Sequence, residues 1–376
     1  MKVQSVNIYN QSFGNSRKKF DVQGHVGSMF DNLHHCKQSY NAQNIIDTVE
    51  SNNVKKILVS SLSGLNPEGS DFFQSELNAA KDIERIKGND NVKIYPLISC
   101  QPGIAKDTSV IEKLLSENKF YGMKFHPTNT NKSIKDNFDI YSKYFDIAEK
   151  NGMPCVFHST SDGKSDPLEI IKLAQKHPKH PVVLYHIDLM ASPEQMSKTI
   201  ENISNSIKDG KSNLYVDISW LTGLFDNAEQ NKNTIKLALE KIGSDRILFG
   251  SDAPIAEMGD KEKYSKFADF VEDTVKEFYK DKPEDAEKAL NNIFYDNAEE
   301  LFVNKKWYQK PINETVTEQV KKSSSSNKKG LLITAGVIAV GILALVAKSL
   351  LNSDKQGKSD INVKNGDNHP SKVKKN

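Results

Sequence analysis

Short apolar runs of strand length alternate along the chain with segments whose apolar residues recur at helical spacing. The runs predict eight strands, at residues 19–25, 54–61, 92–99, 121–127, 154–159, 181–188, 213–219 and 246–254. The helical segments, several ended by glycine or proline, are 41–52, 75–88, 137–152, 166–177, 193–210 and 231–243. This alternation predicts an α/β (β/α)8 TIM barrel. A doubly wound open sheet is the alternative, but no glycine-rich phosphate turn follows the first run.

The pattern changes after the eighth predicted strand. Two further helical stretches, at 263–281 and 285–302, complete a predicted barrel domain of residues 1–302. Residues 303–329 are predicted to be a linker that ends in a serine and lysine run. The polar, lysine-rich residues 352–376 are predicted to be a disordered basic tail.

Residues 330–351 read GLLITAGVIAVGILALVAKSLL and carry no charge from Gly330 to Ala347. About 20 apolar residues are enough for a helix to cross a bilayer, so this run predicts one C-terminal transmembrane helix. Lysines flank both ends of the run, and they do not separate the two orientations. Because the N-terminus carries no apolar signal segment, we expect a single-pass membrane protein whose barrel lies on the cytoplasmic side.

Charge and cysteine content narrow the class of protein. The net charge of +2 hides an asymmetry, because the 11 lysines and 3 aspartates from Lys321 onward leave residues 1–320 at −6. An acidic body does not favour nucleic-acid binding, which requires clustered basic residues. The three cysteines, Cys36, Cys100 and Cys155, form no CxxC pair, and this fits a reducing compartment better than a disulfide framework.

Polar residues gather where the predicted strands end. Histidines fall at the ends of the first, fourth, fifth and sixth strands, and an aspartate falls at the end of the eighth: His25, His126, His158, His186 and Asp252. Barrel enzymes carry their active sites at the carboxyl ends of the strands, so these five side chains are expected to converge. Imidazole nitrogen and carboxylate oxygen are ligands of Zn²⁺, Fe²⁺ and Mn²⁺, so a divalent metal centre is predicted.

Six motifs in order give the chain a family resemblance. FDVQGHVG, GMKFHPT, PCVFHST, VVLYHID, RILFGSDAP and NIFYDNAEELF resemble successive motifs of the metal-dependent amidohydrolase superfamily, and its amidohydrolase-2 branch most, over about residues 19–302. The resemblance implies metal ligation by His25 and His158, a ligand or substrate-facing role for His186, and Asp252 as a metal contact that takes the proton of the attacking water. It implies one ion, with zinc first and iron or manganese as alternatives.

The family's first strand carries a His-x-His pair, and here Gln23 stands in the first position. Three interpretations remain open. Gln23 orients substrate or water beside a metal held by other residues, or it ligates the metal through its oxygen, or it marks a barrel that has lost its metal. A carboxamide oxygen suits zinc less well than imidazole does.

Lys124 alternates with His126 on the fourth predicted strand, so both are expected to face the barrel interior. In two-metal members of the superfamily a lysine of this strand is carboxylated and bridges the ions. We favour instead an interior ion pair or an ammonium that binds an anionic substrate group, because Gln23 argues against two metals. His126 is predicted to be a substrate contact or a neighbour of the ligands. His34 and His35 follow the first strand and are interpreted as loop residues.

These observations predict a membrane-tethered, metal-dependent hydrolase of a small-molecule amide or ester, in which Asp252 is the general base. A nonoxidative decarboxylase with a similar single-metal site is the second hypothesis. A metal-free, membrane-anchored binding scaffold is the third, and Gln23 is the feature that favours it.

Overall fold

The structure is a computed structural model, which describes residues 16–31, 36–40, 42–62, 91–100, 102, 108–130, 132–189, 191–219, 227–255 and 258–308. The strands are β1 Lys19–Asp31, β2 Cys36–Tyr40, β3 Val54–Ser61, β4 Lys93–Pro96, β5 Ile98–Cys100, β6 Met123–Phe125, β7 Cys155–Thr160, β8 Pro181–Leu189, β9 Asn213–Asp217 and β10 Ile247–Leu248. The contacts divide the chain into two units, Met1–Pro311 and Ile312–Asn376, and every element described here belongs to the first.

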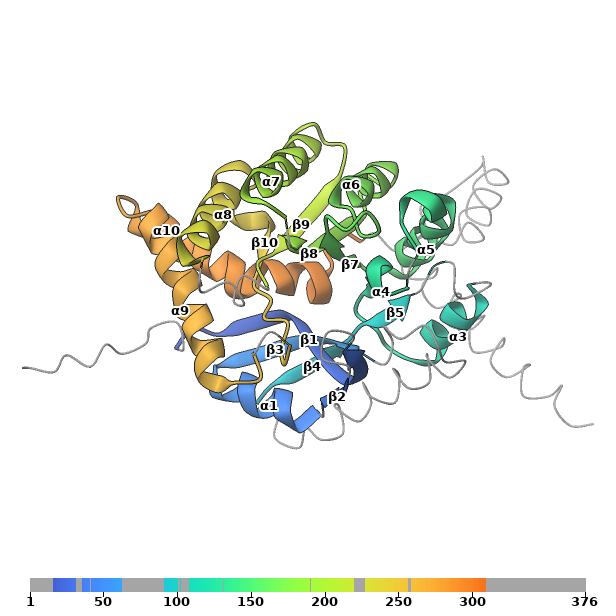
Figure 1. The fold of residues 1–376 in the computed structure, drawn as a ribbon, viewed down its shortest axis with the longest axis horizontal. Coiled ribbons are helices and arrows are strands. Elements are labelled where there is room, and N and C mark those ends of the chain that lie inside the picture. The colour runs from blue at the N-terminus through green and yellow to red at the C-terminus, as the bar shows by residue number, and fades with distance from the viewer. Residues whose placement is uncertain are drawn as a thin grey trace, which may run out of the picture. The chain divides into compact units, whose positions relative to one another are not determined.

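Helices lie between and around the strands (Figure 1). The α-helices are α1 Ala42–Ser51, α3 Ser109–Glu117, α4 Pro127–Thr130, α5 Phe138–Asn151, α6 Pro167–Lys176, α7 Pro193–Lys208, α8 Ala228–Lys241, α9 Lys261–Phe278 and α10 Pro283–Asn291. Short 3-10 turns lie at η2 Lys135–Asn137 and η4 Ser244–Arg246, and π-helical segments at η5 Asn292–Asp296 and η6 Glu299–Asn304.

The helices begin where the sequence supplies capping residues. Asp166 accepts a hydrogen bond from Leu168 N at the start of α6, and Ser192 accepts one from Gln195 N at the start of α7. Asp260 accepts from two amides of the first turn of α9. Such caps satisfy backbone N–H groups that have no partner inside the helix, and the proline at the start of α6 and α7 has no N–H to satisfy.

The strands form two hydrogen-bonded sheets of order β2-β1-β3-β4 and β10-β9-β8-β7-β6-β5. All neighbouring pairs are parallel except the β1–β2 hairpin. The two sheets join at both edges. On one side only Leu97 separates β4 from β5, and on the other Val22 N donates to Phe249 O and His25 N to Ala253 O. Eight parallel strand positions therefore close on themselves, consistent with the predicted TIM barrel.

The core has two layers, as a barrel requires. Strand residues that point outward pack against the surrounding helices, for example Ile57, Phe125 and Phe157. Residues that point inward form a second cluster, which includes Phe20, Leu58, Val156, Val183 and Tyr185 and which packs on Ala298, Leu301 and Phe302 of the C-terminal helical segment. This segment, orange in Figure 1, thereby lies across the amino-terminal ends of the strands.

Local differences from the sequence expectation are small. The predicted strand 92–99 is divided at Leu97, and the eighth strand is regular only at Ile247–Leu248. The predicted helix 285–302 is observed as α10 followed by π-helical turns. The β1–β2 hairpin was not predicted. The predicted helix 75–88, His34 and His35, and the linker, transmembrane helix and tail lie wholly or almost wholly outside the described residues, so the predicted domain boundaries stay predictions.

No helix within the described ranges combines the length and the apolar character that a membrane crossing requires.

Candidate active site

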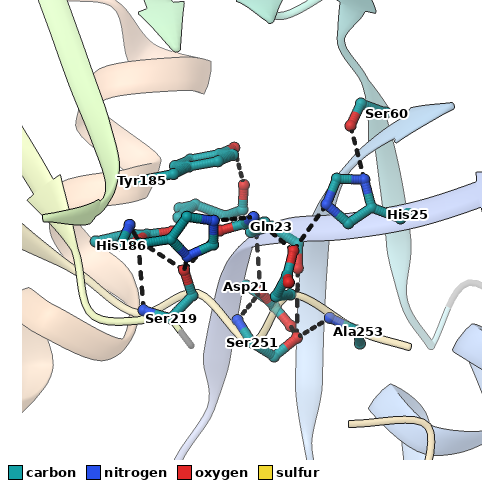
Figure 2. Close-up of polar contacts among 12 residues, drawn as sticks. Asp21, Gln23, His25, Ser60, Tyr185, His186, Ser219, Ser251 and Ala253 are labelled. Atoms are coloured by element: carbon teal, nitrogen blue, oxygen red, sulfur yellow. Dashed lines mark hydrogen bonds and ion pairs between the residues drawn. The ribbon is translucent and has the colours of Figure 1, made fainter. Parts of the chain in front are cut away.

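The carboxyl ends of the parallel strands bring predicted site residues together, and Figure 2 shows Gln23, His25 and His186 among them. His25 Nε2 lies 2.9 Å from Asp252 Oδ1, and Gln23 Nε2 lies 2.6 Å from the same oxygen. The His158 ring lies 5.1 Å from the His186 ring and is stacked 3.9 Å from the His126 ring. The predicted residues of β1, β7 and β8, together with His126 after β6 and Asp252 after β10, therefore form one continuous cluster.

Gln23 takes part in three contacts at the centre of this cluster. Its Nε2 donates to Asp252 and lies 3.3 Å from His186 Nε2, while its Oε1 accepts from Ser219 Oγ at 2.6 Å. A carboxylate only accepts hydrogen bonds, so the amide nitrogen and not the oxygen must face Asp252. The oxygen of Gln23 is therefore directed at Ser219, and the nitrogen connects Asp252 with His186.

The His186 ring is held from both sides. Gln23 Nε2 is a donor, so His186 Nε2 accepts and the ring proton lies on Nδ1, which contacts Ser219 Oγ at 2.8 Å. His186 and Ile187 have φ angles of 67° and 59°, and Asp252 has a φ of 65°. Such left-handed backbone is strained for residues other than glycine and is often found at functional sites. His186 N donates to Asp217 Oδ1, which stabilises this turn.

The buried carboxylate of Asp21 on β1 holds the loop that carries Asp252. Asp21 accepts hydrogen bonds from Gln23 N, Ser251 N, Ser251 Oγ and Tyr264 Oη. Burial raises the pKa of Asp21 to about 6. These contacts connect β1 with the loop after β10 and so determine where Gln23 and Asp252 lie relative to each other.

The loop that follows β10 comes so close to Asp217 at the end of β9 that position 250 requires a glycine. A Cβ on Gly250 would lie 2.4 Å from Asp217 Oδ2, well inside van der Waals contact. Burial raises the pKa of Asp217 to about 7. Sequence reasoning missed Asp217 and Ser219, although NLYVDIS ends in these alternating polar residues as the other strand ends do.

Lys124 lies inside the barrel below the histidines. Its side chain is buried, and its Nζ lies 3.9 Å from the centroid of the Tyr185 ring. Burial lowers the pKa of Lys124 to about 7, opposed by the charges of Asp252 and Asp217. With a pKa near 7 the Lys124 amine is only partly charged at neutral pH, and an anionic group beside it would favour the ammonium form.

The imidazole and carboxylate groups of the site are of the types that bind a divalent metal, although their ligand atoms do not lie close together around one point. Loss of hydration lowers the pKa of His158 to about 3 and that of His186 well below 6.5, so both are neutral and able to ligate at neutral pH. Ser60 Oγ contacts His25 Nδ1 at 3.1 Å, which is the outer contact that a ligating histidine usually has.

Among the described residues, Asp146, Glu149 and His177 are the only histidine, cysteine or carboxylate trio whose ligand atoms all lie within 4.8 Å of one another. That trio belongs to α5 and the end of α6, and its two carboxylates are exposed. No three of His25, His158, His186 and Asp252 meet the same criterion.

The amidohydrolase family, Amidohydro_2, matches residues 99–303, which are more than half of the chain. The chain belongs to the amidohydrolase-2 family. The match confirms the predicted family and the prediction of an enzyme of the amidohydrolase type. A search of curated proteins found no match.

Solved structures share the fold of this amidohydrolase at low sequence identity. A probable 2-pyrone-4,6-dicarboxylic acid hydrolase from Acinetobacter baumannii, with citric acid bound, has a TM-score of 0.52 and 15% identity, covering 76% of this chain and 98% of that one. A dihydroxybenzoic acid decarboxylase from Polaromonas, with manganese and 2-nitroresorcinol bound, has a TM-score of 0.54 and 14% identity, covering 76% and 97%. A 2,6-dihydroxybenzoate decarboxylase from Rhizobium has a TM-score of 0.52 and 14% identity, covering 76% and 98%.

Proposed function

We propose that this amidohydrolase is a metal-dependent hydrolase that acts on a small molecule bearing a carboxylate group. The observation that carries the proposal is the contact of Asp252 with His25 and Gln23, beside His186 and His158, at the carboxyl ends of the barrel strands. The trio of Asp146, Glu149 and His177 lies instead on α5 and at the end of α6, and its two carboxylates are exposed.

His25, His158 and Asp252 would hold one ion, with zinc as the first candidate and iron or manganese as alternatives. A bound divalent ion lowers the pKa of a water molecule and polarises a carbonyl group. Both nitrogens of His186 are engaged by Gln23 and Ser219, so this ring is not among the proposed ligands. Gln23 orients Asp252 and His186 in this proposal and does not ligate.

Asp252 is proposed as the general base. Its Oδ1 accepts hydrogen bonds from Gln23 and His25, and these donors keep the carboxylate in one orientation. A carboxylate held in this way can take the proton of an attacking water within hydrogen-bond distance. His126 is stacked on His158 and would line the substrate pocket at the mouth of the barrel.

Lys124 supports the assignment of an anionic substrate. Its buried ammonium lies over Tyr185 and close enough to Asp252 and Asp217 to interact electrostatically with both. The substrates named for two structural neighbours, a pyrone dicarboxylic acid and a dihydroxybenzoate, are carboxylates as well. We place the substrate carboxylate on Lys124 and the reacting group near Asp252.

Nonoxidative decarboxylation is the second candidate, and it is favoured by the two decarboxylases among the structural neighbours. A metal-free binding scaffold is the third. The observation that favours it is the self-contained hydrogen bonding among Gln23, His25 and Asp252.

The metal content of the purified protein tests the proposal, with His158→Ala and Asp252→Ala as variants. We expect about one zinc, iron or manganese ion per chain by plasma mass spectrometry, and its loss in both variants. A screen of carboxylate-bearing amides, esters and lactones, and of aromatic acids for CO₂ release, then separates hydrolysis from decarboxylation. A folded wild-type protein that binds none of the three ions after incubation would support the scaffold instead.

We further propose that residues 330–351 tether the enzyme to a membrane as a single pass, with the barrel on the cytoplasmic side. The support is the length of the run and its lack of charge from Gly330 to Ala347. Full-length protein should stay with membranes through alkaline carbonate extraction, whereas a chain that ends at Pro311 should be released. Extraction of the full-length protein by carbonate would contradict the tether.

A further inference from the structure

Basic residues mark the beginning of every strand of the barrel. Because the eight strand positions are parallel, their beginnings all lie at the end of the barrel opposite the candidate active site. Each strand has a lysine or arginine within five residues of its start. We call this set the basic rim: Lys18, Lys55, Lys93, Lys119, Lys150, Lys179, Lys211 and Arg246.

Seven members of the basic rim are lysines with exposed side chains. Some rim charges are paired, since Lys211 contacts Asp209 and Arg246 lies 3.9 Å from Asp245. Lys305 and Lys306 add two more basic residues where the described chain ends, and Lys306 pairs with Glu300. Burial lowers the pKa of Lys305 to about 8, and the nearby charge of Lys119 contributes to the shift. Glu299, which pairs with Lys56, adds an acidic group, but the basic side chains at the strand starts outnumber the acidic ones, although residues 1–320 together are acidic.

Aromatic rings accompany the lysines at this end. Lys18 Nζ lies 3.9 Å from the centroid of Tyr295, and Lys119 Nζ lies 5.1 Å from that of Tyr121. Arg246 lies 4.7 Å from the Tyr215 ring. Tyrosine and tryptophan next to lysine and arginine are the residues that proteins place at the boundary between membrane and water.

The chain leaves the barrel at the same end. Tyr308 Oη donates to Lys150 O, and the Tyr308 ring packs on Gly152, just before β7 begins. Only 21 residues, 309–329, separate Tyr308 from the apolar run that begins at Gly330. Those residues include Lys321, Lys322, Lys328 and Lys329, which continue the positive charge toward that run.

We infer that the basic rim is a docking surface for an anionic lipid bilayer. Three observations point to this partner: positive charge on one end of an otherwise acidic domain, aromatic side chains among the lysines, and the exit of the chain at that end. When the rim rests on the lipid, the carboxyl ends of the strands face the opposite direction. The site of Asp252 then opens toward the aqueous phase, so the substrate would be water-soluble and would not enter from the bilayer.

Vesicle binding by residues 1–311 tests the inference without the apolar run, so a failure of the tether and a failure of the rim are distinguishable. This unit contains the whole described core. We expect the domain to co-sediment with phosphatidylglycerol vesicles and not with phosphatidylcholine vesicles, and to be released by added salt. Equal binding to both vesicles, or none to either, would overturn the inference.

Two matched triple variants separate the rim from net charge. Substituting Lys55, Lys93 and Lys179 by glutamine should weaken binding to phosphatidylglycerol vesicles by roughly a hundredfold, since each lysine near an anionic surface contributes about fivefold. The control replaces three exposed lysines of the outer helices, Lys113, Lys143 and Lys266, and should bind as the wild type does. Circular dichroism melts check that both triples fold.

Equal weakening in the two triples would show that only net charge matters and would refute the rim. Tighter binding to a homopolymer RNA than to phosphatidylglycerol would assign the surface to nucleic acid and would refute the lipid partner.

Discussion

Gln23→His restores the histidine pair that the family places on the first strand. The contacts of Gln23 determine how this substitution changes stability and metal binding. The carboxamide makes one hydrogen bond to a charged group, Asp252, and two to neutral groups, His186 and Ser219. Loss of all three would destabilise the fold by about 3 kcal/mol. An imidazole can keep one of them, the bond to Asp252, so we expect a loss of about 1–2 kcal/mol without metal.

Metal should offset most of this loss at the proposed site. A second imidazole beside His25 should tighten binding by at least about tenfold, since changes even to outer partners of a ligand alter affinity by about 10–100-fold. A tenfold change in affinity is about 1.4 kcal/mol of additional stabilisation at the same free metal concentration. The histidine variant should therefore be less stable than the wild type after chelation and should recover most of the difference in zinc.

Urea unfolding with and without zinc measures both effects, and calorimetric titration gives the affinity directly. Gln23→Leu is the matched control, because it removes the same hydrogen bonds and offers no ligand. We expect it to lose about 3 kcal/mol and to bind zinc more weakly than the wild type. If zinc stabilised all three proteins equally, residue 23 would not face the metal and the assignment of this site would be refuted.

Three further substitutions test the supports of the site and the fold. Gly250→Ala should destabilise the protein by about 3 kcal/mol in a urea titration, because its Cβ would lie 2.4 Å from the buried Asp217 carboxylate. Tyr264→Phe removes one donor from Asp21 and should cost about 1–2 kcal/mol in the same assay. Burial lowers the pKa of His180 to about 3 from 6.5, so the unfolded chain binds the proton first and stability falls as the pH drops below 6.5. His180→Gln should remove about 2 kcal/mol of that fall between pH 6.5 and pH 5, and an unchanged pH profile of the free energy of unfolding would contradict this.

The sequence predicts the strands, the barrel class and the chemistry-bearing ends of the strands for a physical reason. In a buried strand, apolar residues alternate with polar groups only where the polar side chains face one common site, as those of His25, His158 and His186 do. The partners of these groups could not be read in the same way. Periodicity places Ser219 on a strand end, but it does not say that Ser219 contacts Gln23 and His186 together.

Backbone irregularities explain most of the remaining differences. The left-handed conformations of His186 and Ile187 occur at residues whose side chains do not favour them, so the sequence there contains no residue pattern that would predict a turn. The π-helical turns after α10 likewise arise from packing of Leu301 and Phe302 on the barrel interior, because 292–302 alone reads as an ordinary amphipathic helix.

The hydrogen bonds of Asp252 indicate how tightly a metal can be held. Gln23 and His25 both donate to Asp252 Oδ1, so the carboxylate is already satisfied by protein groups. An ion that bound His25 Nε2 and Asp252 would first have to break the bond between them. A hydrogen bond to a charged group contributes about 1.5–3 kcal/mol, which corresponds to a loss of about one to two orders of magnitude in metal affinity. Gln23 can keep its hydrogen bond to Asp252 while the metal is bound. A histidine at position 23 would replace that hydrogen bond with a metal ligand. We therefore expect an ion that exchanges readily, and an enzyme whose activity follows the metal concentration of its compartment.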